Sequence, residues 1–362
     1  MQKSSSVKKS PVDSLLLILV LLLVFMGLMV LFSASEYNGR VRFHDSAYYF
    51  KKQLFATALG LGAMYAVSSV DYHIFIRIAP AAYLLSLILS TAVILVGQEI
   101  NGSKRWLSLG PLSFQPSEFA KVAVILFLVW QIEKSRKKPR SFWFLCRTML
   151  SLLPVAGLVG SNNLSTAIII LGIGVILVFS SSPGYIQFVG PACAGVGFIG
   201  IFLAAESYRL ERLAIWRNPE KYEKGFQTIQ GLYAIGSGGL FGRGFCNGIQ
   251  KLGFVPEAQN DMIFSIICEE FGLTGAAFLI IVFGLLLWRL CVISLHSKDL
   301  AGALVSAGIM GHLAIQVILN IAVVTNTIPN TGITLPFFSY GGTSVMFLLG
   351  EIGLALNISR QI

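Results

Sequence analysis

Charge is scarce in this sequence. Only 12% of the 362 residues are Asp, Glu, Lys or Arg, while 55% are hydrophobic and the mean hydropathy is +0.75. Soluble domains carry roughly 25% charged residues, so this composition excludes an ordinary water-soluble fold. Histidine and cysteine are also rare. The four histidines are scattered and the five cysteines have no paired spacing, which argues against a histidine-based metal centre, a disulfide framework and a zinc site.

Apolar runs recur along the whole chain, each close to the roughly 20 residues that cross about 30 Å of hydrocarbon. The sequence therefore predicts an all-α, polytopic membrane protein with about ten transmembrane helices in a single domain, 1–362. The expected helices are 12–32, 52–69, 74–97, 118–132, 147–161, 164–180, 186–205, 263–288, 302–324 and 342–358. The first run is predicted to be a retained helix, because its apolar core exceeds the about 7–15 residues of a secretory signal. A large loop, 206–262, separates the seventh and eighth helices.

The orientation of the chain is predicted from its basic residues. Ten spans place both termini on one side, and a basic run in the loop after the fourth helix predicts that this side is cytoplasmic. The run consists of Lys134, Arg136, Lys137, Lys138 and Arg140. Counted over all loops, this run included, Lys and Arg divide evenly between the two sides, with 13 on each, and seven of those outside lie in the loop 206–262. They form either a solvated surface or a surface that binds an anionic head group.

An outer segment, 101–118, leads into the fourth helix and carries Arg105. Glu118 and Lys121 are three residues apart, so they share one face of that helix, and Lys121 lies about 5 Å below its start. A structural ion pair accounts for both residues. A charge inside the membrane boundary is also a candidate for function, and both interpretations stay open.

Asp261 stands where the loop 206–262 meets the eighth helix. Partial burial at that position would raise the pKa of its carboxyl toward that of a useful base, whereas a purely structural role would be to cap the helix. Glu269 and Glu270 follow about 12–14 Å further along a regular helix, where they should be paired, protonated or in a wet cavity. The glycines at 236–244 make only a weak nucleotide site, since no strand precedes them and no P-loop lysine follows.

Two further features involve uncharged polar residues. The segment 326–344 lacks charge and mixes helix breakers with apolar, hydroxyl and amide side chains, which predicts a loop buried in protein. In the ninth helix His312, Gln316 and Asn320 are spaced by four and share one face. Interhelical hydrogen bonds explain this face more readily than a transport path does.

At these residues the chain resembles the SEDS family, the shape, elongation, division and sporulation proteins that include FtsW, RodA and SpoVE. The similarity covers nearly the whole chain. It rests on Gly102-Ser-Lys-Arg-Trp, Phe114-Gln-Pro-Ser-Glu118, Ile235-Gly-Ser-Gly-Gly-Leu-Phe-Gly242, Gln250-Lys-Leu-Gly253, Pro256-Glu-Ala, Asp261, Glu269-Glu-Phe-Gly272 and Thr334-Leu-Pro-Phe-Phe-Ser-Tyr-Gly-Gly342.

The resemblance implies a peptidoglycan glycosyltransferase that polymerises lipid II into a β-1,4 glycan with inversion and releases undecaprenyl diphosphate. Asp261 matches the family's essential aspartate and is the expected catalytic base. A diphosphate leaving group needs positive charge, for which Arg105 and Lys121 match family positions. The full set of expected substrate-binding residues is Arg105, Glu118, Lys121, Gln227, Gln230, Ser237, Glu257 and Ser339. A divalent cation, Mg²⁺ or Mn²⁺, would suit the diphosphate, with unknown ligands; no other cofactor is expected.

The family also implies a partner, a class B penicillin-binding transpeptidase with one transmembrane helix, and no nucleic-acid partner. The expected location is the bacterial cytoplasmic membrane, with the active site on the extracytoplasmic face. The motifs at 332–336 and 342–344 lean slightly toward the division or sporulation branch.

The chain departs from the family's motifs in two places. Asn162-Asn-Leu-Ser-Thr166 replaces Pro-Asp-Leu-Gly-Thr, so a charge-dependent role at Asn163 is in doubt, and Ala258-Gln-Asn260 replaces Ala-His-Thr. The competing functions are a lipid II flippase and a non-catalytic scaffold.

Overall fold

The structure, a computed structural model, describes residues 12–100, 103–109, 112–135, 142–181, 193, 197, 200 and 207–362. Long helices dominate it. They are α1 Ser14–Phe43, α2 Tyr48–Ser69, α3 Tyr72–Val96, α4 Pro116–Lys134, α5 Phe142–Leu150, α6 Leu153–Asn162, α7 Leu164–Ser181, α9 Ser207–Arg217, α10 Phe226–Gly238, α11 Ile263–His296, α12 Leu300–Val324 and α13 Gly342–Ser359.

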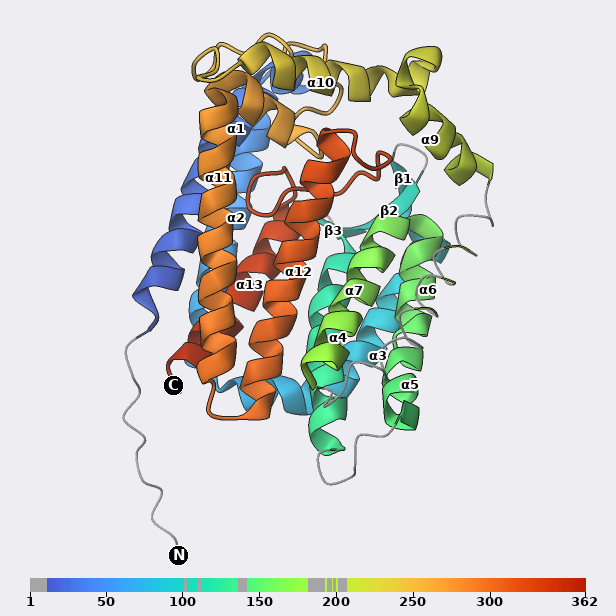
Figure 1. Cartoon of the computed structure of the whole chain (residues 1–362), viewed down its shortest axis with the longest axis vertical. Helices are drawn as coiled ribbons and strands as arrows, with labels where there is room; N and C mark the ends of the chain where they lie inside the picture. The colour runs from blue at the N-terminus through green and yellow to red at the C-terminus, as the bar shows by residue number, and fades with distance from the viewer. Residues whose placement is uncertain are drawn as a thin grey trace, which may run out of the picture.

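The helices form a bundle whose long members lie roughly parallel (Figure 1). We call the end that carries α9 and α10 the upper end. The lower end is the one where α1 begins and α13 ends (Figure 1). Within the described part of the chain, α1, α3, α7, α11, α12 and α13 are long and apolar enough to cross a membrane. The predicted all-α, multi-pass architecture is confirmed.

Most predicted helices coincide closely with helices of the structure, but α1 and α11 extend well beyond the predicted ends, to Phe43 and His296. The predicted helix 186–205 lies almost entirely outside the described residues, so the count of ten stays a prediction. Most of the basic run used for orientation, 136–140, also lies outside them.

The predicted single helix 147–161 is wrong. The chain forms two short helices there, α5 and α6, separated by Ser151 and Leu152. Pro154 lies in the first turn of α6, where a residue without an N–H is tolerated. A continuous helix would have needed that N–H as a donor to Leu150.

The connection between α3 and α4 is a small antiparallel sheet, which the sequence analysis did not predict. Its strands are β1 Gln98–Ile100, β2 Ser103–Leu109 and β3 Leu112–Phe114, paired in the order β1-β2-β3. The strands are short and hold Arg105, in β2, at the upper end of the bundle (Figure 1). Pro116 then starts α4 within its first turn.

The large loop 206–262 is partly helical, since it contains α9 and α10. Helix α10 packs on α11 at the upper end of the bundle (Figure 1). Helix α11 is itself interrupted at Gly272, whose φ of 66° and ψ of −165° are not helical. Glycine suits this conformation because it carries no Cβ.

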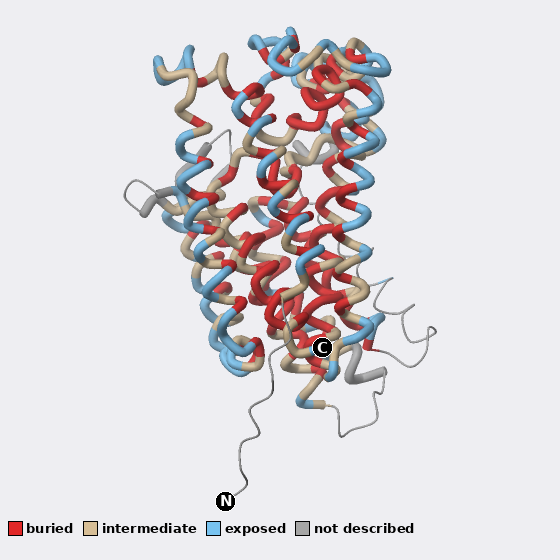
Figure 2. The backbone as a smooth tube through the Cα atoms, turned by 90° about the vertical axis from the view of Figure 1, so that its left-hand side faces the viewer, coloured by how far each residue is buried: buried red, intermediate tan, exposed pale blue. Residues whose placement is uncertain are grey.

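The core runs along the interior of the bundle, and the exposed positions lie on its outer sides and ends (Figure 2). Many exposed positions on the long helices are apolar, among them Phe25 on α1, Phe55 on α2 and Ile281 on α11. An exposed apolar surface around a bundle is what a hydrocarbon environment requires.

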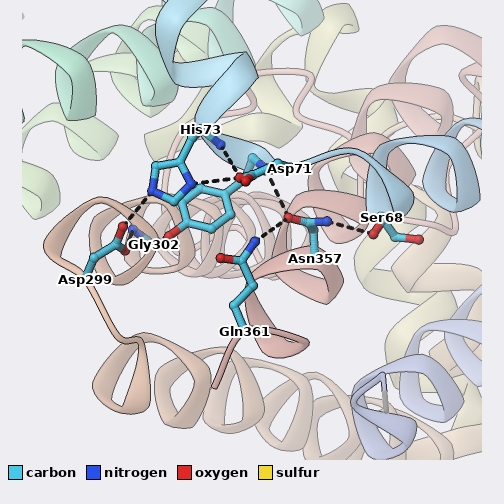
Figure 3. Close-up of polar contacts among 8 residues, drawn as sticks. Ser68, Asp71, His73, Asp299, Gly302, Asn357 and Gln361 are labelled. Atoms are coloured by element: carbon cyan, nitrogen blue, oxygen red, sulfur yellow. Dashed lines mark hydrogen bonds and ion pairs between the residues drawn. The ribbon is translucent and has the colours of Figure 1, made fainter. Parts of the chain in front are cut away.

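At the lower end, a cluster of polar side chains links the helices by hydrogen bonds (Figure 3). Asp299, before α12, accepts a hydrogen bond from the Tyr72 hydroxyl at 2.7 Å. The two ring nitrogens of His73 face carboxylates of Asp71 at 2.7 Å and Asp299 at 2.8 Å. The Tyr72 N–H donates to Asn357 of α13 at 3.0 Å. This cluster joins the start of α3 to α12 and α13.

Candidate active site

Four segments that are distant in the sequence meet around Asp261 at the upper end. Asp261 ends the loop before α11, Gln227 lies in the first turn of α10, Arg105 lies in β2, and Gly332 lies between α12 and α13. The loop that carries Gly332 extends toward β1 and β2 (Figure 1). The structure thus brings together residues that the sequence analysis could only select separately.

The Asp261 carboxylate is half-buried and accepts a hydrogen bond from Gln227 Nε2 at 3.3 Å. Burial raises the pKa of Asp261 to about 6, and the Glu257 carboxylate acts in the same direction, whereas Gln227 and Arg105 oppose the rise. A carboxyl group with a pKa near 6 is ionised at neutral pH and is more basic than a free aspartate. These are the properties of a general base.

Asp261 does not cap α11. The N-cap is Met262, which offers no side-chain acceptor, and Asp261 lies one residue further out. The expected capping role is therefore wrong. The backbone of Asp261 is held instead by Asn320 of α12, whose Nδ2 donates to the Asp261 carbonyl at 2.9 Å and to the Ile333 carbonyl at 2.7 Å.

Gly332 lies beside both the Asp261 carboxylate and the Arg105 guanidinium. A Cβ built on this glycine would lie 3.8 Å from Asp261 Oδ2 and 3.9 Å from Arg105 Nη1, and its φ of 69° is strained for other residues. Both charged groups are therefore within 4 Å of the same point. A side chain at position 332 would occupy the space between them.

Arg105 also lines a small cleft between α3, α4 and α6. Its Nε donates to the Asn162 carbonyl at 3.2 Å, and Ser117, Asn162 and Asn163 line the cleft beside it. Asn163 Oδ1 accepts the Thr166 N–H in the first turn of α7, at 3.3 Å. An aspartate at this position could accept the same hydrogen bond. Asn163 therefore keeps the structural role that the family's aspartate would have, but without its charge.

The amide of Gln227 has a fixed orientation. Asn330 Nδ2 donates to its Oε1 at 3.4 Å, which leaves Nε2 to face Asp261. Gln230 lies one turn further along α10 and is partly buried. Ser237 is ten residues beyond Gln227, about 15 Å along the helix, and its hydroxyl donates to Ala234 within α10. Ser237 is therefore not part of the group around Asp261.

Glu257 adopts a positive φ of 52° and pairs with Arg42 of α1 at 2.8 Å. It also accepts a hydrogen bond from Asn260 at 2.7 Å. Its carboxylate is thus partly neutralised while it raises the pKa of Asp261. The sequence analysis missed Arg42 because it ended the first helix at 32, before this residue.

The second half of the segment after α12 is a buried loop, as predicted, whereas residues 326–332 are only partly buried and Thr327 is exposed. Leu335, Phe337, Phe338 and Ser339 are each less than 5% exposed. The Ser339 hydroxyl donates to the Asn260 carbonyl at 2.5 Å and accepts the Leu335 N–H at 2.8 Å. Ser339 thus joins this loop to the residue before Asp261, and its hydroxyl is occupied by backbone groups.

Below the site, Lys121 is buried, with only 2% of its side chain exposed. Its ammonium pairs with Glu118 at 3.0 Å and donates to Gln316 Oε1 at 3.2 Å. The expected ion pair is confirmed. Gln316 Nε2 donates to the Thr334 carbonyl at 3.1 Å, so the pair is linked to the loop that contains Gly332.

The same network fixes the protons on His312. The Thr334 carbonyl can only accept a hydrogen bond, so it faces the Gln316 Nε2 group. Lys121 can only donate, so it faces Gln316 Oε1. The same oxygen lies 2.9 Å from His312 Nε2. His312 Nε2 therefore donates. Its Nδ1 lies 2.8 Å from Glu351, and one proton between them satisfies this contact. The polar face of α12 thus makes interhelical hydrogen bonds at His312 and Gln316, as predicted, while Asn320 bonds to loop carbonyls.

Glu269 and Glu270 are both paired, as predicted. Glu270 receives Lys251 Nζ and the Ser33 hydroxyl, each at 2.5 Å. Glu269 accepts the backbone N–H groups of Ile249 and Gln250 at 2.8 and 3.2 Å. These contacts bind the segment 249–251 to α1 and to the part of α11 before Gly272.

The glycine-rich segment is not a phosphate loop. The N–H groups of Arg243 and Gly244 donate to the Glu269 and Glu270 carbonyls, each at 2.9 Å. Gly239 and Leu240 carbonyls accept the N–H groups of Leu273 and Thr274. The segment 239–244 thus satisfies the backbone groups that the interruption of α11 leaves without helical partners.

The side chains around Asp261 do not provide enough ligands to hold a divalent cation without the substrate. No group of three or more His, Cys, Asp and Glu side chains that could ligate a metal occurs in the part of the chain that the structure describes. Asp261 is flanked by Gln227, and the nearby Glu257 is paired with Arg42.

Comparison with known proteins identifies the family. A family model described as a cell cycle protein, FtsW/RodA/SpoVE, matches residues 13–362. The chain belongs to this family. Stage V sporulation protein E of Bacillus subtilis (strain 168) is 38% identical to it over 366 residues, covering 98% of both chains. The probable peptidoglycan glycosyltransferase FtsW of Trichlorobacter lovleyi is 34% identical, covering 96% of this chain and 93% of the relative.

Solved structures agree with the bundle. The fold resembles a chain of a peptidoglycan synthase complex that coordinates polymerization and crosslinking, with a TM-score of 0.81 and 30% identity over 96% of this chain and 98% of that one. RodA of Thermus thermophilus gives a TM-score of 0.72 and 30% identity, covering 96% and 97%. The resemblance to FtsW, RodA and SpoVE is therefore confirmed.

Proposed function

We propose that this FtsW/RodA/SpoVE protein is a peptidoglycan glycosyltransferase that polymerises lipid II. The observation that carries the proposal is the closeness of Asp261 and Arg105, which both lie within 4 Å of a Cβ built on Gly332. A carboxylate and a guanidinium so close together suit the roles of base and cation in this reaction. Relatives whose names include peptidoglycan glycosyltransferase FtsW support the same activity.

In the proposed reaction, the 4-hydroxyl of one lipid-linked disaccharide attacks the anomeric carbon of another. Asp261 takes the hydroxyl proton as the new carbon–oxygen bond forms. The bond from the anomeric carbon to the diphosphate breaks with inversion, and undecaprenyl diphosphate leaves with the electron pair. Asp261 then returns the proton to solvent.

Arg105 is the residue best placed to stabilise the leaving diphosphate. Its guanidinium remains charged at any physiological pH and suits phosphate oxygens. Gln227 and Asn330 orient the base, and Gln230 extends the same face of α10. Lys121 acts from below, because it reaches this region only through Gln316 and Thr334. Any cation in the reaction would be carried by the diphosphate as part of the substrate.

A flippase is the main competing function, and it needs a polar route across the bundle. The polar face of α12 does not provide one. His312, Gln316 and Asn320 are each at most 1% exposed and are bonded to neighbouring helices or loops. A scaffold role needs neither the orientation of Gln227 toward Asp261 nor the small residue at position 332.

The location and the partner follow from the proposed activity. We place the upper end of the bundle on the extracytoplasmic face of the cytoplasmic membrane, with both termini cytoplasmic. The resemblance to a chain of a peptidoglycan synthase complex supports a penicillin-binding partner. We propose that this partner is a single-pass class B transpeptidase, which would crosslink the strands made at Asp261.

The test is the substitution Asp261→Asn in the purified full-length protein, assayed with labelled lipid II with and without the transpeptidase. The amide keeps the size of the side chain but cannot take the proton, so the rate should fall by roughly 10²–10⁴. Products should be resolved by length, and folding followed by thermal melting.

Asp45→Asn is the matched control. Asp45 is a partly exposed aspartate at the same end of the bundle that pairs with Lys51 at 2.8 Å, so the control removes the same charge from a carboxylate with its own partner. It should leave polymerisation unchanged. If the Asp261→Asn protein folds and still makes long strands at the normal rate, Asp261 is not the base.

A further inference from the structure

The segment after α10 carries an unusual number of exposed apolar side chains. We call residues 240–254 the rim loop. Its exposed members are Leu240, Phe241, Phe245, Ile249, Leu252 and Phe254, with exposed fractions of 61%, 80%, 36%, 47%, 49% and 49%. A water-soluble loop rarely exposes so many large apolar residues together.

Helix α11 shows at what level this loop lies. Residues 263–270 are all buried, and exposed apolar residues begin at Leu273, which is 61% exposed. From Leu273 to His296 the helix is about 36 Å long, enough to cross the hydrocarbon. The upper limit of the lipid-facing surface on α11 therefore lies near Gly272.

The rim loop is bonded to α11 at this limit. The N–H groups of Leu273 and Thr274 donate to the carbonyls of Gly239 and Leu240, at 2.9 and 3.0 Å. The Phe245 ring also lies 6.1 Å from the Phe271 ring, measured between centroids. Leu240 and Phe241 thus extend the lipid-facing surface of α11 at its upper edge.

Helix α1 contacts the rim loop at a similar level. A run of exposed apolar residues on α1 ends at Phe32, and the next residue, Ser33, is bonded to Lys251 of the rim loop. The following turns carry the ion pair of Glu36 with Arg40, and exposed apolar residues return only at Val41 and Phe43, near the end of the helix. The rim loop therefore runs from α11 to α1 along the upper edge of the apolar surface. Figure 2 looks onto this side of the bundle.

The charges of the rim loop suit a lipid head-group region. It contains no Asp or Glu, Lys251 is used internally by Glu270, and Arg243 is exposed between the two phenylalanines 241 and 245. An apolar edge with an adjacent cation is typical of segments that lie in a membrane interface and bind anionic lipid.

We propose that the rim loop is an interfacial anchor, which inserts its exposed apolar side chains into the boundary between head groups and acyl chains of the adjacent leaflet. Arg243 contacts lipid phosphates. Because the loop also satisfies the backbone at the interruption of α11, the anchor holds α10 and the segment before Gly272 at a fixed height above the bilayer. This proposal does not depend on the glycosyltransferase activity.

Photo-crosslinking of the full-length protein tests the proposal. The aromatic photoreactive residue p-benzoylphenylalanine would replace Phe241, in vesicles that contain radiolabelled phosphatidylglycerol. Phe278, an exposed residue in the lipid-facing part of α11, is the positive control, and Lys221, exposed near α10, is the negative control. We expect labelling at 241 comparable to that at 278 and several-fold above that at 221.

Labelling at 241 no higher than at 221 would overturn the proposal, as would crosslinks to a partner protein alone. Leu252 provides a second position if the protein substituted at 241 does not fold. The variant Arg243→Gln should reduce labelling at 241 more in phosphatidylglycerol than in phosphatidylcholine. Equal labelling of both lipids in the variant and the parent would remove the assigned role of Arg243.

Discussion

Replacing Lys121 by methionine separates a structural role of this residue from a role in substrate use. The ammonium is 2% exposed, and both of its partners, Glu118 and Gln316, are buried. Methionine fills similar space but leaves the Glu118 carboxylate without its cation. Removal of one partner of a buried ion pair costs about 3–5 kcal/mol of folding free energy. Lys121→Met should therefore melt several degrees below the parent.

The double variant Lys121→Met with Glu118→Gln restores the balance of charge. Neutral replacement of a whole buried pair is often close to neutral for stability, so most of the lost melting temperature should return. Thermal unfolding in detergent and polymerisation of lipid II would be measured on the parent, both single variants and the double variant. This cycle isolates the coupling between the two side chains.

The activity of the double variant then assigns the role. A stable double variant that polymerises normally would show that Lys121 is structural, and a stable but inactive one would show that its charge is needed for the substrate. If Lys121→Met alone were as stable as the parent, the reasoning from the buried carboxylate would be refuted.

Four further outcomes follow from the structure. Because the pKa of Asp261 is about 6, polymerisation should fall about tenfold per pH unit below that value, and a profile flat down to about pH 4.5 would exclude Asp261 as the base. Because the pKa of Asp261 is raised in the folded protein, the free energy of unfolding of the parent should fall as the pH rises from about 4 to about 6. The melting temperature of Asp261→Asn should therefore depend less on pH in that window than the melting temperature of the parent. Gly332→Val should abolish polymerisation, and unchanged polymerisation would move the reaction away from this point. An impermeant thiol reagent should reach Glu220→Cys on intact cells and Lys298→Cys only after lysis; the reverse would invert the proposed orientation.

The fold was largely predictable because its signal is local. A run of apolar residues long enough to cross the membrane has few alternatives, so α3, α7, α12 and α13 coincide with their predicted ranges within two residues. The extensions of α1 and α11 were missed because hydropathy ends where the membrane ends. A helix need not end there when its further turns find partners in the protein, as α1 does through Arg42 and Glu257.

The candidate site was predictable only in part. Asp261 could be selected because it stands near the membrane boundary and matches the family's essential aspartate, and the structure excludes the competing role, capping. Its relation to Arg105 depends on Gly332, which comes from a third segment and has no chemical signature of its own. Pairings such as Arg42 with Glu257, and Lys251 with Glu270, join residues far apart in the chain that no periodicity connects.

The network below the site also bears on how the chain enters the membrane. Glu118 and Lys121 neutralise each other within α4, so this helix can insert without a net charge. His312 and Glu351 arrive later, on α12 and α13, and one shared proton leaves that pair without net charge as well. Because α13 is synthesised after α12, His312 has no partner for Nδ1 until Glu351 has been made. The insertion of α12 therefore leaves a polar group inside the bundle whose partner arrives only with the following helix.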